Sequence, residues 1–333
     1  MYLYIWPITY PYAKQLTWDW MSKIFVFDLV IGYTLYGFWH FMTMNDLKTE
    51  YADVKSYKLT PYKYNKKNQY YDKEENNLTR EIFLTTLGLL QSSMWQIALM
   101  YVYANNLWGI STYTPFFSPT GDWKYNAWSI GSIVFVTYWR ELHFYWAHRL
   151  EHGFGWEGAW KYLDFGKLLY DISHSWHHRS TNPGPWAGLA MHPIEHFMYY
   201  TCAALPFLGY FFPTLVFHPL HHLYAKYHAV IAPIGGHDGL SNPGGGGDYH
   251  YLHHAAFDCN YGVPLIDFDR LFGSWVELEW YTICGNKLRY AKSYGKYLAQ
   301  TNNKDKALEL VAKEFNTTVA AVTSVGGTGK KVN

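Results

Sequence analysis

Long apolar stretches alternate with polar, charged segments along this chain of 333 residues. Crossing the hydrocarbon core of a bilayer takes about 20 predominantly apolar helical residues. Four stretches come near that length: Ile24–Met42, Ile82–Tyr103, Trp128–Ala147 and Phe197–Phe217. The last one has no charged residue but contains Pro206 and Pro213 as kink or turn points. The pattern predicts an all-α integral membrane protein with about four transmembrane helices.

The charges of the connecting segments predict which helix ends face the cytosol. Asn45–Arg80 carries eight Lys or Arg residues, whereas Ala104–Asn126 carries only Lys124. Positive charge favours the cytosolic side, so the first connection is expected in the cytosol and the second on the far side. The third stretch then returns to the cytosol. The fourth leaves it again, and a segment from Thr214 comes back, since about 23 helical residues cover about 35 Å. Two hairpins with a helical cytosolic cap are predicted.

Histidines gather in three clusters, all on the side predicted to be cytosolic. Eight of them have helical ligand spacing, i, i+3, i+4 in two clusters and i, i+4 in a third: His148, His152, His174, His177, His178, His250, His253 and His254. Positions so spaced share one face of a helix. Neutral imidazole is the commonest side-chain metal ligand, and eight imidazoles are too many for one tetrahedral zinc. The alternative is a histidine-rich surface or scattered core histidines. Three clusters at ligand spacing favour a site for two metal ions.

Other polar residues near these clusters are candidates for supporting roles. Glu141 lies seven residues before His148, nearly in line with it on a helix, where a carboxylate can orient an imidazole. Pairing of Glu141 with Arg140 at the membrane interface is the alternative. The returning segment carries three further histidines that either contact substrate or are buried and hydrogen-bonded: His218, His221 and His222.

Composition narrows the function classes. A formal net charge of +1 gives no reason to expect a nucleic-acid partner. Aromatic residues make up 20% of the chain, which is typical of aromatic belts at membrane interfaces. The three cysteines have no metal or redox spacing and are expected to be free thiols. The N-terminus, with Pro7 and Pro11, lacks the pattern of a cleavable signal peptide. Gly244–Gly247 is expected to form a flexible turn, because no strand precedes it as in a phosphate-binding loop.

Several motifs together carry a resemblance to a known family. His148-Arg-Leu-Glu-His152, His174-Ser-Trp-His-His178 and His250-Tyr-Leu-His-His254 resemble the histidine boxes of the sterol desaturase / fatty acid hydroxylase superfamily. Met191-His192-Pro193-Ile194-Glu195 resembles the family's His-Pro-x-Glu/Asp element, and His237-Asp238-Gly239 is similar to the His-Asp-Gly of sterol C-5 desaturases. The resemblance covers about Thr137–Trp275, including a closing segment that matches in order and spacing.

The resemblance implies a multi-pass enzyme of the endoplasmic reticulum membrane with a histidine-bound di-iron centre facing the cytosol. Such an enzyme would use O2, and electrons from a separate carrier such as cytochrome b5, to desaturate or hydroxylate a lipid. Imidazoles alone do not select iron over zinc or copper, so the metal is implied by the family. The expected site then includes His237 as a ninth ligand and His228, on the returning segment, as a tenth. Three residues are candidate catalytic groups: Glu141, His192 and Glu195. Lys330-Lys331 resembles a dilysine retrieval signal.

The chain is accordingly divided into an N-terminal membrane hairpin with a basic cytosolic connection (1–126), a histidine-box catalytic domain (127–285) and a C-terminal cytosolic tail (286–333). Within Lys304–Val322, apolar residues at helical spacing predict a short amphipathic helix packed on the cap. An apolar pocket, open to the bilayer and wide enough for fused rings, is expected between the third stretch and the fourth stretch with its returning segment. Its expected walls are Phe135, Tyr138, Phe144, Trp146, Phe197, Leu208 and Phe217.

Three functions are compatible with these features. A desaturase or oxygenase of sterols is favoured by His237-Asp238-Gly239 and the closing segment. A hydroxylase of fatty acyl or sphingoid chains is the second. The third is a non-catalytic membrane-complex subunit that keeps the fold and the metals for structure.

Overall fold

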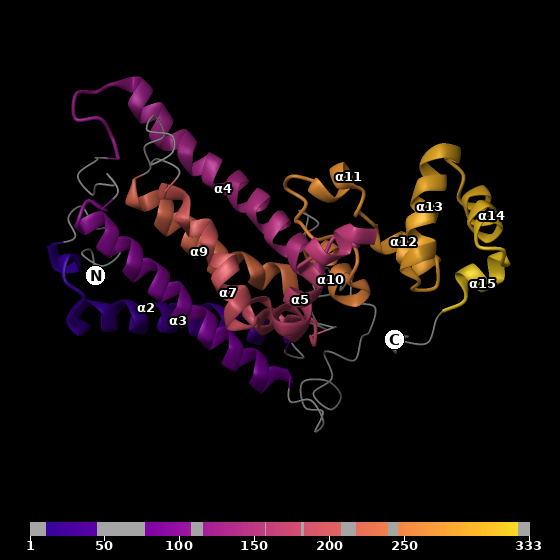
Figure 1. The fold of residues 1–333 in the computed structure, drawn as a ribbon, viewed down its shortest axis with the longest axis horizontal. Coiled ribbons are helices and arrows are strands. Elements are labelled where there is room, and N and C mark those ends of the chain that lie inside the picture. Colours follow the sequence, from indigo (N-terminus) through magenta and orange to yellow (C-terminus); the bar gives the residue numbers. More distant parts are fainter. Residues whose placement is uncertain are drawn as a thin grey trace.

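The computed structural model describes residues 11–44, 77–107, 116–156, 158–180, 183–207, 218–238 and 246–325. These residues form helices and turns with no strand among them, so the all-α prediction is confirmed for this part of the chain. Figure 1 shows the long helices inclined beside one another, with the shorter helices of the second half gathered at one end. The predicted turn near residues 211–213, Gly244-Gly245 and the Lys330-Lys331 pair lie outside the described residues. Gly246 and Gly247, predicted to belong to a flexible turn, instead begin a helix.

Four helices are long: α2 (Trp18–Met44), α3 (Asn77–Ala104), α4 (Trp123–His152) and α9 (Pro219–His237). The others are short: α5 (Gly166–Leu169), α6 (Ser175–His177), α7 (Pro193–Tyr200), α10 (Gly246–Ala256), α11 (Phe268–Phe272), α12 (Leu278–Ile283), α13 (Leu288–Thr301), α14 (Lys304–Glu314) and α15 (Val319–Thr323). Single turns of 3-10 helix occupy Pro11–Lys14, Gly158–Leu163, Pro185–Leu189 and Thr201–Phe207, and a π-helical turn occupies Tyr170–His174.

Two of the long helices are long and apolar enough to cross a bilayer, over Trp18–Thr43 of α2 and Leu78–Ala104 of α3. Buried core helices of soluble proteins can be equally apolar. In α2, however, Val26, Val30 and Phe38 are exposed, as expected of a helix that faces lipid. Helices α4 and α9 carry ionisable residues, and no such span was found on them. Two of the four predicted spans are therefore supported by hydropathy, and the other two remain a prediction.

The fourth apolar stretch does not form one continuous helix. It begins as α7, whose N-terminus is capped by His192, and continues as the 3-10 turn Thr201–Phe207. The returning arm is α9, which starts after His218 with Pro219 in its first turn. His218 and His221 form a capping box. The side chain of His218 accepts from the backbone N–H of His221, and the side chain of His221 accepts from the backbone N–H of His218. Pro193 and Pro219 thus start helices, whereas Pro206, predicted as a kink or turn point, lies in the 3-10 segment, and Pro213 lies outside the described residues.

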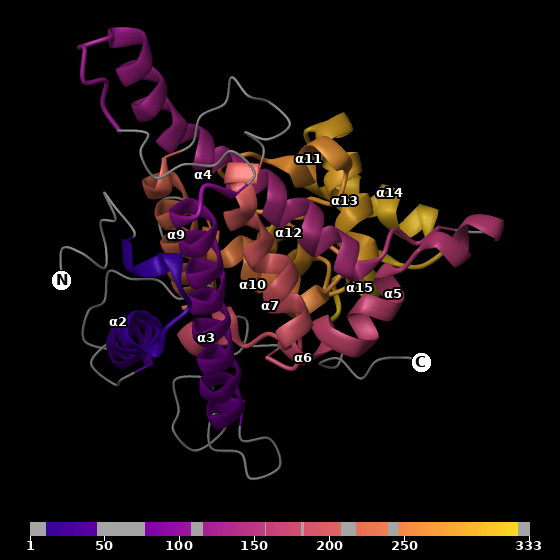
Figure 2. The same ribbon diagram turned by 60° about the vertical axis from the view of Figure 1, so that its left-hand side comes forward.

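Helix α9 lies at the centre of the bundle and packs against α2, α3 and α4. Figure 2 looks nearly along α2 and shows α3 standing beside it with α9 behind. The core between these helices includes Tyr36, Leu89 and Val230. The hydroxyl of Tyr36 donates to the carbonyl of Val230, which joins the first helix to the last long one across 194 residues. This core fixes the end of α9 against the 3-10 segment Pro185–Leu189, which follows the second histidine box.

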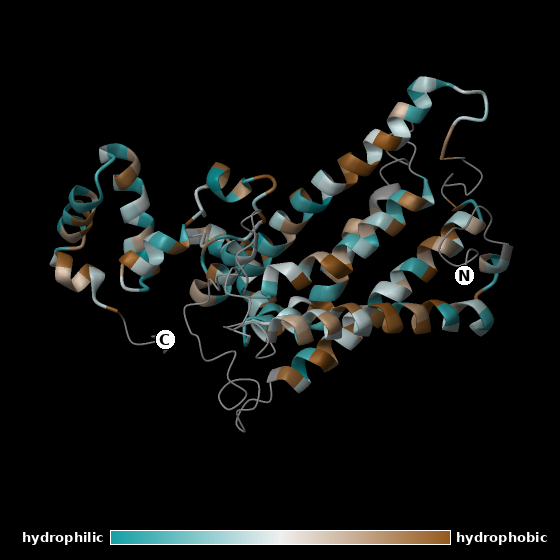
Figure 3. Ribbon diagram, turned by 180° about the vertical axis from the view of Figure 1, so that it is seen from behind, coloured by the Kyte–Doolittle hydropathy of each residue, from teal (hydrophilic) through white to brown (hydrophobic). Residues whose placement is uncertain are grey.

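The C-terminal helices form a second core on the cap. Leu252 of α10 packs with Val276, Tyr294 and Val311 from the segments that follow it. The amphipathic tail is thus packed on the cap as predicted, but it is two helices, α14 and α15, because Asn316 adopts a left-handed backbone with φ 47° between them. Figure 3 shows hydrophobic residues along the long helices and more hydrophilic ones in this C-terminal part.

Candidate metal centre

Helix α4 delivers the first histidine box. His148 and His152 lie in its last two turns, and the helix stops at Gly153, which has φ 74° and donates its N–H to the carbonyl of Leu150. Gly166, at the start of α5, packs directly on Gly153, since a Cβ at Gly166 would lie 2.1 Å from the Gly153 Cα. Only a glycine permits that approach. The contact turns the chain back so that the second box faces the first.

The second and third boxes come from short helices around the end of α4. His174 ends the π-helical turn, and His177 and His178 follow on and just after α6. An extra residue in a helical turn is frequent at functional sites, because it re-aims the side chains that follow. Helix α10 carries the third box with its histidines buried. His237 enters from the last residue of α9.

Nine of the ten predicted ligands converge into two groups of ligand atoms, each within 4.8 Å of one another. The first group has five members: His148, His152, His174, His178 and His253. The second has four: His177, His237, His250 and His254. All are buried except His152, which is partly buried. The fold thus brings together two groups of side chains, each of which could hold one metal ion.

The spacing of the nitrogens is that of ligands around one ion. In the first group the Nε2 atoms of successive pairs lie 2.9–3.1 Å apart. Two nitrogens each about 2.1 Å from one metal ion, at right angles, are about 3.0 Å apart. In the second group the Nε2 atoms of His237 and His254 are 3.1 Å apart. Five nitrogens at this separation exceed a tetrahedral sphere and fit an ion of higher coordination number.

Hydrogen bonding at the opposite ring nitrogens fixes the tautomers. The Nδ1 atoms of His148 and His253 lie 2.6 Å and 2.7 Å from the backbone carbonyls of Tyr261 and Cys259, and a carbonyl only accepts. Each Nδ1 therefore carries the proton, and each Nε2 presents a lone pair. Neighbouring Nε2 lone pairs cannot hydrogen-bond to one another, so a cation between them is the arrangement that satisfies them.

Electrostatics keep these imidazoles neutral and ready to bind metal. Burial, followed by the charge of neighbouring histidines, holds the pKa of His174, His177 and His178 well below the usual histidine value. The pKa values of the third-box histidines are lowered in the same way. Neutral imidazole is the form that coordinates a metal, so burial prepares the cluster at neutral pH.

Two buried carboxyl groups face the other side of His174. Its Nδ1 lies 2.7 Å from Glu195 Oε1 and 3.7 Å from Glu151 Oε2. Burial, and the proximity of Glu151, raise the pKa of Glu195. Glu195 was predicted from its motif, whereas Glu151 was not, because it lies one residue before His152 and adjacent helical positions face different directions. The fold brings it to His174 from the side.

Three predicted site residues lie elsewhere. His228 belongs to neither group, because it lies more than two turns before the end of α9, where His237 joins the second group. Its Nδ1 accepts a hydrogen bond from Arg140. His192 caps α7, and its ring contacts Trp176. Among the described residues Glu141 makes no hydrogen bond to a histidine, and it instead lines a cavity. His228 is therefore withdrawn as a ligand, and His192 serves as a helix cap. The histidines of the returning segment are buried and hydrogen-bonded, with His221 bonded to Ser129.

The side chain of Asp269 supports the ligands indirectly. Asp269 accepts from the N–H groups of Tyr261 and Gly262 and from the hydroxyls of Tyr249 and Ser274. It thereby fixes the loop whose Tyr261 carbonyl orients His148. Asp269 lies in the closing segment of the resemblance, within Thr137–Trp275, but no pattern of spacing assigns it this role.

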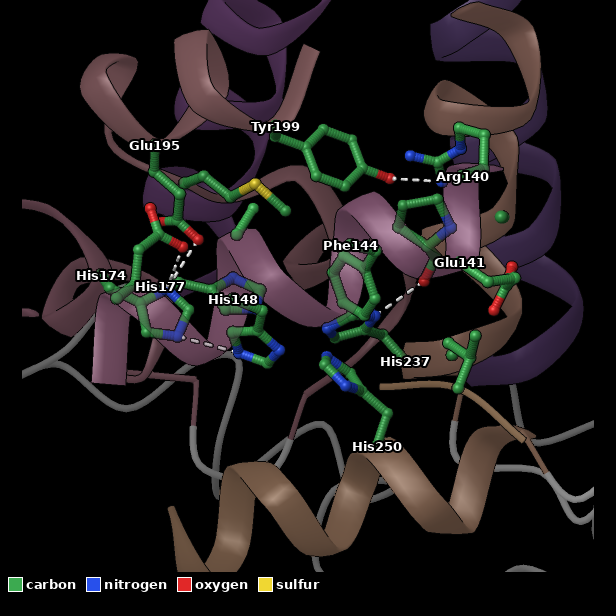
Figure 4. Close-up of a pocket in the computed structure, with 18 of the residues that line it drawn as sticks. Arg140, Glu141, Phe144, His148, His174, His177, Glu195, Tyr199, His237 and His250 are labelled. Atoms are coloured by element: carbon green, nitrogen blue, oxygen red, sulfur yellow. Dashed lines mark hydrogen bonds and ion pairs between the residues drawn. The ribbon is translucent and has the colours of Figure 1, made fainter. Parts of the chain in front are cut away.

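An apolar cavity of about 260 Å³ ends at the histidines. Figure 4 shows Phe144 between the histidines and a polar set formed by Arg140, Glu141 and Tyr199. Of the predicted walls, Phe144 lines this cavity, whereas Phe135, Tyr138, Trp146 and Phe197 are exposed on the outside. The opposite wall comes from α9, through Ala232 and Pro233, and from Met191. The residues 208–217 expected in this wall lie outside the described part of the chain.

A second hollow, of about 580 Å³, reaches the first metal group from another direction. It touches His152, which does not line the apolar cavity, and its walls include Lys161, Lys167 and Asp164. The centre is therefore approached by an apolar and a polar cavity.

Comparisons with known proteins agree with this centre. Residues 133–274 match the family model described as fatty acid hydroxylase. The chain is 28% identical over 257 residues to the lathosterol oxidase of Homo sapiens, covering 73% of this chain and 77% of that protein. It is 29% identical over 212 residues to the lathosterol oxidase of Rattus norvegicus, covering 60% and 62%. It is 28% identical over 165 residues to a Delta(7)-sterol 5(6)-desaturase of Gibberella zeae, covering 44% and 42%.

The match thus spans less than two thirds of the rat and fungal relatives, and no solved structure matches. The matched segment nonetheless contains every histidine of the two groups, together with Glu151, Glu195 and Asp269. Residues 133–274 therefore carry a domain of the sterol desaturase / fatty acid hydroxylase superfamily, and the relatives indicate an oxidoreductase.

Proposed function

We propose that this protein uses O2 to desaturate or hydroxylate a membrane sterol at a centre of two iron ions. The observation that carries the proposal is the convergence of nine imidazoles, eight of them buried, at the closed end of an apolar cavity. The names of the relatives, which refer to sterol oxidation, support a sterol as the substrate.

The two groups of histidines would hold one ion each, five imidazoles on the first and four on the second. When bound, two redox-active irons supply the means of activating O2 and removing hydrogen from an unactivated C–H bond, which zinc does not. Imidazole ligands suit iron, and the family supports iron over the other metals that imidazole binds. The ligand set, rather than any bound ion, is the basis of this assignment.

The chain's own side chains would orient the ligands and the lipid. Glu195 holds the Nδ1 proton of His174 and thereby directs its Nε2 to the metal. Phe144, Met191 and Pro233 line the cavity and exclude water from the reacting carbon. Catalysis by such a site depends on holding one C–H bond against the centre.

The electron balance requires a donor. Full reduction of one O2 takes four electrons, whether both oxygen atoms leave as water, as in desaturation, or one enters the product, as in hydroxylation. In either reaction the substrate gives two electrons and a separate carrier protein gives two. We propose a carrier of the cytochrome b5 kind. The polar hollow at His152 supports access from the aqueous side.

The expected setting is the endoplasmic reticulum membrane, with four spans and the centre on the cytosolic face. Residues 1–126 would anchor the centre, 127–285 would form it, and 286–333 would cover the cap. The exposed apolar side chains of α2 support a lipid environment for the first part.

Reconstitution tests the function. The purified chain, loaded with iron in nanodiscs and supplied with an electron donor and O2, is incubated with a Δ7-sterol. Loss of two hydrogens identifies a desaturase and gain of one oxygen a hydroxylase. The His253→Ala variant, which removes a ligand of the first group, is expected to be inactive.

A fatty acyl or sphingoid hydroxylase is the second candidate, favoured by the modest volume of the cavity, since whole-ligand pockets measure about 300–1,000 Å³. Conversion of an acyl chain and not of the sterol in the same assay would select it. Absence of O2-dependent turnover with either lipid would leave a structural subunit.

A further inference from the structure

The cavity has a polar end that the metal centre does not use. Glu141 of α4 is only 8% exposed, lines the cavity, and has no hydrogen-bond partner for its Oε2 among the described residues. A buried oxygen without a partner costs free energy, so it marks a place where a ligand donates. In Figure 4 this carboxyl group lies on the far side of Phe144 from His174 and Glu195.

Arg140 fixes the surroundings of this carboxyl group. Its guanidinium is buried and donates to the His228 Nδ1 at 3.2 Å, to the Cys202 sulfur at 3.6 Å and to the Tyr199 hydroxyl at 3.2 Å. None of these partners is a carboxylate. The hydroxyl of Tyr199 in turn donates a hydrogen bond to the Ala229 carbonyl at 2.8 Å. The cation is therefore held rigidly beside Glu141, with its donors directed at neutral groups.

The cavity opens at one side and closes at the histidines. Ala232 of α9 is exposed and Phe144 and Val263 are half-buried, whereas all five histidines of the lining are buried. Glu141 and His148 are two helical turns apart on one face of α4, about 10 Å along its axis. A molecule bound between them spans from Glu141, past Phe144, to the centre.

We propose that Glu141, set in place beside Arg140 and Tyr199, binds the hydroxyl group of the sterol substrate. This inference rests on the proposed function. A carboxyl group accepts a hydrogen bond from an alcohol in either of its protonation states. The walls between Glu141 and the histidines are apolar, as a ring system requires. The site therefore selects free sterols over sterol esters and ethers, which have no such proton.

The same geometry limits the position oxidised. With the hydroxyl at Glu141 and the centre at His148, the reacting carbon lies within roughly 10 Å of the hydroxyl oxygen. In a sterol this distance is reached within the fused rings, whereas the end of the alkyl side chain is farther away. Oxidation of the ring system follows.

Binding to the metal-free full-length protein in nanodiscs tests the proposal without turnover. The probes are lathosterol and its methyl ether at the same oxygen. A hydrogen bond to a charged or strongly polar group is worth enough to make the wild type bind lathosterol about 10-fold or more tightly than the ether. Glu141→Leu is expected to reduce that ratio to about one, and Glu141→Gln, which keeps an amide oxygen, to an intermediate value.

Met191→Leu is the matched control, because Met191 lines the same cavity without a polar group. It should change the affinity for both probes equally. Iron uptake by Glu141→Leu should equal that of the wild type and shows that the variant is folded. Loss of iron uptake on Glu141→Leu in a protein that remains folded would instead make Glu141 a support of the histidines and overturn the proposal.

The remaining outcomes are decisive. An unchanged ratio in Glu141→Leu, or equal binding of both probes by the wild type, overturns hydroxyl recognition while leaving a sterol pocket in place. No binding of lathosterol by the wild type overturns the sterol substrate as well. Turnover of the ether as fast as of lathosterol, with binding also equal, contradicts the selection of free sterols.

Discussion

At the scale of single residues, His174 is the most constrained ligand of the centre. Its Nε2 lies about 3 Å from the Nε2 atoms of His148, His152 and His178, while its Nδ1 faces Glu195. The ring cannot rotate without losing either its carboxylate or its place in the group. The orientation of the first metal group therefore depends on a carboxyl group that never reaches the ion.

Glu195→Gln should weaken metal binding without removing the site. The amide keeps the size of the side chain but can turn its NH2 group, a donor, toward the His174 Nδ1, where the carboxyl oxygen of Glu195 accepts. Partners of this kind are worth about 10- to 100-fold in metal affinity. Iron content measured after dialysis against a chelator series checks this, with the exposed Glu309→Gln as the control. Equal retention of iron by both variants would show that Glu195 does not orient the ligand.

His178 and His228 form a matched pair for the ligand assignment. His178→Ala removes one of five nitrogens from the first group, so about one iron ion per chain should be lost or weakly held. His228→Ala should keep both ions, since His228 bonds only to Arg140 in this region. Metal analysis of the purified variants checks both expectations. Loss of iron from His228→Ala alone would reinstate it as a ligand.

The chemistry of the ligands was predictable from spacing because i, i+3 and i+4 place side chains on one face whatever surrounds the helix. The acceptors behind them were not. The carbonyls of Tyr261 and Cys259 are backbone groups, which carry no residue signature. His228 was misassigned because its sequence position places it near the site, whereas its helical turn faces Arg140.

At the scale of elements, the length of the apolar stretches predicted the long helices, and buried polar residues fix how these helices are aligned against one another. Asp28 of α2 accepts from Lys226 of α9 at 2.5 Å and from Ser93 of α3 at 2.6 Å, and Lys226 also donates to Gln96. In the sequence Asp28 and Gln96 read as interruptions of apolar stretches. In the structure they are points of contact between three helices. Asp28 and its partner Lys226 are 198 residues apart in the sequence, so no local pattern indicates the pair.

Lys226→Met should destabilise the bundle, since it leaves the Asp28 carboxylate buried without its cation. Removing one member of a buried pair costs about 3–5 kcal/mol, whereas replacing both is often nearly neutral. The double variant Asp28→Leu, Lys226→Met should therefore recover much of the loss. Denaturant titration of the detergent-solubilised protein measures both. A single variant as stable as the wild type would mean that the pair contributes little to holding α2, α3 and α9 together.

At the scale of the whole molecule, the described contacts place the first turn of α3 beside the centre. Arg80, at the start of α3, donates to the backbone carbonyl of Trp176 and to Ser180, both beside the second histidine box. Glu81 accepts from Ser180 at 2.6 Å. The first turn of α3 therefore adjoins the centre. Charge counting predicts that the basic segment Asn45–Arg80, which ends in this turn, faces the cytosol, and the side of the membrane on which the centre lies stays a prediction.

Cysteine labelling tests this arrangement. The three native cysteines are buried, so a single introduced cysteine reports its own position. In sealed microsomes a membrane-impermeant maleimide should label Lys58→Cys, in the basic connection, and Glu309→Cys, on α14 of the cap. Lys124→Cys, exposed in the first turn of α4, should react only after permeabilisation, because α4 is proposed to start on the far side of the membrane. Its 30 residues span about 45 Å, which exceeds a bilayer core of about 30 Å. Labelling of Lys124→Cys and Glu309→Cys from the same side would mean that α4 does not span the membrane, and the centre would then rest on the bilayer through α2 and α3 alone.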